Sequence, residues 1–168
     1  MRRFFGILAV IGFILSVIVH GLTFLGVDPQ QDFRFVWLLH IGIFAVWIPA
    51  VIISKKDGTL KGNDFWRIAT QGWPRWMKVL PGILFGYVLF NFFFSLFVLN
   101  EGGNPGVING EKVLHSHGRI IRKLTDQEYH LHKAYLVRGF SGHWLLFYAI
   151  AAMILYPERK QEQQAPVS

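Results

Sequence analysis

Four long apolar runs constrain this chain more than any other feature of its sequence. They cover residues 4–25, 35–53, 79–99 and 140–156, and none of the ten Asp and Glu residues falls inside them. A helix needs about 20 apolar residues to cross about 30 Å of hydrocarbon. Backbone amides in lipid must be paired, and the runs lack the alternating pattern of barrel strands. They therefore predict an all-α integral membrane protein with four transmembrane helices.

The first and last runs need separate arguments. The first lies where a signal peptide would, but it exceeds the usual apolar core of about 7–15 residues, and no small-residue cleavage site precedes Asp28. We expect a retained helix. The last run is short, and it gains length if its helix begins near Tyr135. Arg138 would then lie where its side chain can reach the headgroups.

Basic residues predict the orientation of the four spans. Of the 17 Lys and Arg residues, ten fall in the termini and the second connection, and the denser side should face the cytoplasm. The ten are Arg2, Arg3, Lys55, Lys56, Lys61, Arg67, Arg75, Lys78, Arg159 and Lys160. We expect a multi-pass protein of a bacterial inner (plasma) membrane with both termini cytoplasmic; the inverted topology is the alternative.

The inner connection, residues 54–78, mixes aromatic and basic side chains, and Asn63 or Asp64 can cap a short helix within it. This mixture suits an amphipathic segment lying on lipid headgroups. Membrane anchoring explains it without nucleic acid, so no nucleic-acid partner is expected. The tail, residues 157–168, is polar and is expected to be disordered.

The outer connection, residues 100–139, predicts a small extracytoplasmic cap made of a β-hairpin and a helix. Residues 101–106 have the composition of a loop, and residues 112–115 and 119–124 read as two strands joined by a turn. Thr125 and Glu128 form a capping box, so a helix should begin at Asp126 and run toward Arg138. Gly139, Ser141 and Gly142 are expected to loosen the chain before the last span.

All seven histidines fall on the outer half of this topology. Gly12, Ser16 and His20 recur every four residues, a small-residue stripe that turns His20 toward other helices. We hypothesise that His20 and His40, at matching depth, are axial ligands of haem b or another tetrapyrrole such as a chlorin, with His143 as a third candidate. The alternative is that these imidazoles only hydrogen-bond across the bundle.

A second hypothesis places a zinc or copper site in the cap. His115 and His117 would share one face of a strand, while Glu128 and His132 lie one helical turn apart. These four residues lack the spacing of an established zinc motif, so solvated surface histidines are the alternative.

The sequence does not favour an enzyme, because the context of Ser141 is not that of a nucleophile elbow and no phosphate-binding loop is present. Phenylalanine-rich spans and a structured cap instead predict a non-catalytic accessory or scaffold subunit of a larger membrane complex, with the bilayer and other membrane-protein subunits as partners. The alternative function is a haem b-, chlorin- or metal-binding redox membrane protein that uses the outer histidines.

Three stretches of the outer half resemble a family of small four-helix bacterial membrane proteins that has no assigned activity. They are residues 113–119 (VLHSHGR), 125–129 (TDQEY) and 138–144 (RGFSGHW). The resemblance implies the same four-helix plan, and it implies no site residues.

Overall fold

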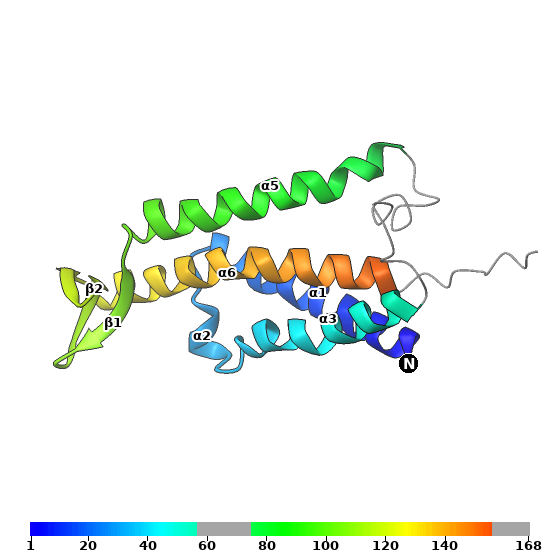
Figure 1. The fold of residues 1–168 in the computed structure, drawn as a ribbon. Coiled ribbons are helices and arrows are strands. Elements are labelled where there is room, and N and C mark those ends of the chain that lie inside the picture. The colour runs from blue at the N-terminus through cyan, green and yellow to red at the C-terminus, as the bar shows by residue number, and fades with distance from the viewer. Residues whose placement is uncertain (57–74, 156–168) are drawn as a thin grey trace, which may run out of the picture.

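The computed structural model describes residues 1–56 and 75–155 (Figure 1). In chain order the elements are α1 (Arg2–Phe24), α2 (Pro29–Asp32), α3 (Leu38–Lys56), the 3-10 helix η1 (Arg75–Val79), α5 (Leu80–Phe93), the π-helix η2 (Phe94–Leu99), β1 (Asn104–Ile108), β2 (Glu111–Ser116), β3 (Arg119–Lys123) and α6 (Asp126–Leu155). Most of the inner connection and the tail, including the predicted helix at Asn63 or Asp64, lie outside the described residues.

The described residues contain four helices long and apolar enough to span a membrane, as predicted from the four runs. These are α1, α3, α5 together with η2 over Pro81–Leu99, and α6. Helix α3 continues to Lys56, three residues beyond the predicted end of its span. In η2 the N–H of Asn100 donates to the carbonyl of Ser95 at 3.0 Å, an i to i+5 bond that closes the π-helix.

Helix α6 is continuous over 30 residues, and this corrects the predicted break before the last span. Gly139, Ser141 and Gly142 are buried inside the helix. A Cβ on Gly139 would lie 3.4 Å from Ser95, and one on Gly142 would lie 3.1 Å from the Asn91 amide. These small residues therefore allow close helix contact rather than a bend, because packing outweighs the local preference of glycine for loops.

All the other long helices pack on α6. It lies between α5 on one side and α1 with α3 on the other (Figure 1). The predicted small-residue stripe of α1 is buried, from Gly12 through Ser16 to His20. The Tyr148 ring of α6 packs against Gly12 and its hydroxyl lies close to Gly42, and this hydroxyl donates to the Leu39 carbonyl at 2.8 Å.

The cap has three antiparallel strands in the order β1-β2-β3, one more than predicted. Strands β2 and β3 match the predicted hairpin, whereas β1 occupies part of the segment that was expected to be a loop. Its residues pair along β2, from Asn104 opposite His115 to Ile108 opposite Glu111. Two-residue turns with positive φ at both positions join the strands, Asn109-Gly110 and His117-Gly118. Such turns match the twist of a hairpin.

Two of the three glycines of α1, Gly12 and Gly21, make a matched test of the packing on α6. An added Cβ at Gly12 would overlap the Tyr148 ring, whereas one at Gly21 would meet nothing within 4 Å. Because Tyr148 is buried and held by its hydroxyl, Gly12→Ala should lower the free energy of unfolding by about 1–3 kcal/mol. Gly21→Ala should be neutral or stabilising by up to about 1 kcal/mol. Unfolding in detergent measures both, and equal effects would contradict the described packing.

Candidate functional site

A capping box begins α6 and fixes the first carboxylate of the site. The Thr125 hydroxyl accepts from the Glu128 N–H at 3.2 Å, while Glu128 Oε2 accepts from the Thr125 N–H at 2.8 Å. This reciprocal pairing satisfies amides that the first helical turn leaves without partners. It confirms the box read from the sequence, and it holds the Glu128 side chain at the edge of the sheet.

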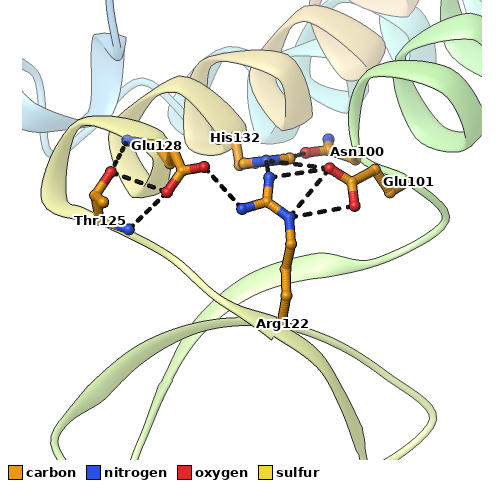
Figure 2. A network of polar contacts seen from close by, with 6 residues as sticks. All are labelled: Asn100, Glu101, Arg122, Thr125, Glu128 and His132. Carbon is orange, nitrogen blue, oxygen red and sulfur yellow. Dashed lines mark hydrogen bonds and ion pairs between the residues drawn. The ribbon is translucent and has the colours of Figure 1, made fainter.

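Arg122 joins the sheet to α6 and to the segment after η2 (Figure 2). From β3 its Nη1 donates to Glu128 Oε1 at 2.8 Å, and its Nη2 donates to Glu101 Oε1 at 3.0 Å. Its Nε lies 3.3 Å from both oxygens of Glu101. One planar guanidinium therefore bridges two carboxylates from different elements, a geometry suited to its fixed fork of donors.

His132 is the buried end of this network. Its Nε2 lies 3.2 Å from Arg122 Nη2, and its Nδ1 lies 2.9 Å from Asn100 Oδ1. Because a guanidinium only donates, Nε2 accepts and the proton is on Nδ1, which donates to Asn100. If the Asn100 amide were turned around, its oxygen would accept from the Leu136 N–H. Its NH2 group would then face the protonated Nδ1, so that two donors would meet.

The charges of the network stabilise one another. The hydrogen bonds from Arg122 are the main cause that holds the pKa of the Glu101 carboxyl below its usual value. The same bonds to Glu101 and Glu128 raise the pKa of the Arg122 guanidinium. The side chains of Arg122 and Glu101 are 36% and 43% exposed, so solvent screens their attraction.

The four residues of the predicted cap metal site do not converge in this structure. His117 lies beyond β2 in the turn, with φ of 48°, so the alternation along a strand does not place it beside His115. Glu128 and His132 both accept hydrogen bonds from the Arg122 guanidinium, which is itself a cation. Residues 1–56 and 75–155 contain no group of three or more His, Asp or Glu side chains placed to hold a metal ion.

His130 ties the cap to residues 26–34, the turn between the first two predicted spans, which we call the outer turn. Its Nδ1 lies 3.0 Å from Oδ2 of Asp28, whose side chain is 3% exposed. The other Asp28 oxygen accepts from the Gln30 N–H and so caps α2. Neither Asp28 nor His130 was among the predicted site residues. The Asp28-Pro29 pair is a local signal for the start of helix α2, because Asp is favoured at the N-cap and Pro at the first helical position. It does not indicate that Asp28 contacts α6.

A second polar cluster lies between the apolar helices, around His20. Its Nδ1 lies 2.7 Å from Ser141 Oγ, and its Nε2 is hydrogen-bonded to the Tyr87 hydroxyl. Ser141 also donates to the Arg138 carbonyl at 3.2 Å, so it accepts from His20. His20 therefore joins α1 to both α5 and α6, which agrees with its predicted inward position.

The three histidines of the tetrapyrrole hypothesis contact different neighbours. Both nitrogens of His20 are engaged, and Trp144 Nε1 donates to His40 Nδ1 at 3.0 Å. That bond places the His40 proton on Nε2, so neither ring of the pair offers a lone pair to iron in this arrangement. His143 Nδ1 donates to the Gly139 carbonyl at 3.2 Å, and its ring packs on Phe92.

The chain was compared with models of known protein families, with curated proteins and with solved structures, and none of them matches it.

The Arg122 network predicts a pH dependence. Because the folded pKa of Glu101 is lowered, its contribution to stability is complete above the ordinary carboxyl pKa and is lost as the pH falls through the lowered value. Arg122→Gln should cost about 1 kcal/mol at neutral pH and flatten this dependence. Lys123→Gln, which removes an equal charge from the exposed pair with Glu111, is the control. Hydrogen exchange of the β3 amides between pH 3 and 7 measures the effect, and identical profiles for both variants would contradict it.

Proposed function

We propose that this chain is a polytopic membrane protein, with both termini cytoplasmic in a bacterial inner membrane, that serves as a non-catalytic accessory or scaffold subunit. The surface of its helices supports the membrane location. Large apolar side chains of α1, α3 and α5 are exposed, among them Phe4, Ile14, Ile41, Ile83 and Phe90. Exposed apolar side chains on the long helices suit lipid or protein neighbours, not water.

The rigid attachment of the cap carries the functional part of the proposal. Because α6 continues from the cap into the bundle, and Arg122 and His130 hold the sheet and the outer turn to it, the cap is a fixed platform. Val107 on β1 and Ile120 and Ile121 on β3 remain exposed on this platform. Exposed β-branched residues on edge strands are a typical docking surface for another protein.

The polar groups inside the bundle also favour a structural role. His20, Tyr87 and Ser141 bind one another, and Asn91 binds the backbone of α6. Hydrogen bonds of this kind join membrane helices and set their rotation. The histidine layer that suggested a redox cofactor thus serves, in this proposal, to orient α1, α3 and α6 beneath the docking surface.

Purification in mild detergent tests the docking surface directly. We expect the wild-type chain to elute with a stoichiometric partner subunit, and Ile120→Lys to release it, because a charge on the exposed strand opposes an apolar interface. Phe33→Lys is the matched control, since Phe33 is an exposed apolar residue of the outer turn outside the cap. Light scattering gives the mass of the protein in each complex.

Two outcomes would contradict this proposal. If wild type and both variants elute as a colourless single chain of 19.3 kDa, no partner is bound and the docking proposal is wrong. A Soret band in the visible spectrum of the purified protein would instead support the tetrapyrrole hypothesis for the histidine layer.

A further inference from the structure

Arg138 places a cation between the outer ends of α1 and α5 without a carboxylate partner. Its Nε donates to Asn91 Oδ1 at 3.1 Å, and the Asn91 amide donates back to the Arg138 carbonyl at 2.8 Å. The guanidinium carbon lies 3.8 Å from the centre of the Phe24 ring and 5.9 Å from that of Phe94. Within residues 1–56 and 75–155, no Asp or Glu forms an ion pair with it.

The position of Arg138 along α6 matches the edge of a bilayer. Seventeen residues separate it from Leu155 at the inner end of the helix, a rise of about 26 Å at 1.5 Å per residue. The hydrocarbon core is about 30 Å thick. The guanidinium therefore lies close to the outer boundary of the hydrocarbon, at the level where lipid phosphates begin.

An apolar groove lies between α5 and α6 inward of this level. Its outermost wall residue on α6 is Leu146, eight residues or about 12 Å from Arg138. The volume of the groove is about 460 Å³, and its walls include Leu84 of α5 and Leu146, Ala149 and Met153 of α6. Ala149 is eleven residues from Arg138, about three helical turns, so both lie on one face of α6. Tyr87 is the residue of the groove nearest the polar cluster, where its hydroxyl binds His20.

At this boundary the terminal nitrogens of Arg138 have no hydrogen-bond partner among the described residues, so they can bind an anion. An inorganic anion would compensate the charge but would leave the apolar groove in contact with water or detergent. A zwitterionic lipid would fill the groove, but its own ammonium would oppose the guanidinium. Only an amphiphile with a net negative headgroup satisfies both features, because a guanidinium binds phosphate oxygens through paired donors.

We propose that Arg138 and the α5–α6 groove form a binding site for one anionic phospholipid of the outer leaflet. The phosphate binds the terminal nitrogens of Arg138 between Phe24 and Phe94, and one acyl chain lies along Leu84 and Ala149. This inference rests on the membrane location proposed above. It does not depend on the docking role of the cap.

Native mass spectrometry of the detergent-purified chain tests the site with phosphatidylglycerol and phosphatidylcholine of identical acyl chains. We expect one retained phosphatidylglycerol per chain, and about tenfold weaker retention of phosphatidylcholine. Arg138→Gln should weaken phosphatidylglycerol binding by about tenfold, a loss typical of a charge-assisted pair. Arg138→Lys should keep only part of the binding, because an ammonium retains the charge but not the paired donors. Arg34→Gln removes an equal charge from the exposed outer turn and should change nothing.

A second pair of variants tests the groove without touching the charge. Ala149→Phe should fill it and release the lipid, whereas Ala45→Phe, at an exposed position of α3, should not. Circular dichroism checks that each variant keeps its helices. Glycerol phosphate, which has the headgroup but no acyl chain, should not bind at millimolar concentration.

Three results would overturn the site. They are equal retention of the two lipids, unchanged binding in Arg138→Gln, and binding of glycerol phosphate as tight as that of the lipid. The docking proposal and the lipid site fail in different experiments. If no partner co-purifies, the docking proposal is wrong, but lipid retention by the isolated chain is unchanged.

Discussion

The close approach of α6 to its neighbours is the constraint on which the rest of the structure depends. It contacts α1, α3, α5 and the cap sheet, and small residues of α6 lie where α5, η2 and α1 approach it. Gly139 and Gly142 admit Ser95 and Asn91, and Ser141 admits His20. A larger side chain at any of these positions would separate the helices and break the hydrogen bonds that depend on short distances.

The polar residues inside the bundle follow from that contact. Once α1 and α5 lie close to α6, His20, Tyr87 and Asn91 can satisfy one another and the α6 backbone, which an apolar environment requires of buried polar groups. The same helix carries the charge network of the cap. Arg122 and its two carboxylates lie beyond the proposed membrane boundary, so solvent screens them, whereas Arg138 lies at the boundary and has no acidic partner among the described residues.

The sequence predicted those features that depend on residues close together in the chain. The length of the apolar runs predicted the four long helices, and the Thr125-Glu128 spacing predicted where α6 begins. Strand β1 was missed because its glycine- and proline-containing residues have no strand preference of their own and are ordered by pairing with β2. The break expected at Gly139 is absent because packing against Ser95 overrides propensity. The rotation of α3 about its axis is not a local property, so the partners of His40 could not be read from the sequence.

We propose that α6 passes as one helix from an outer cap into the membrane, and labelling of single cysteines tests this arrangement. The chain has no native cysteine, so single cysteines can be placed at Lys133 in the cap, Phe147 in the span and Lys56 at the end of α3. With an impermeant maleimide on intact cells, we expect labelling at position 133, none at 147, and labelling at 56 only after permeabilisation. Labelling at 56 but not at 133 in intact cells, or equal labelling at all three positions, would contradict it.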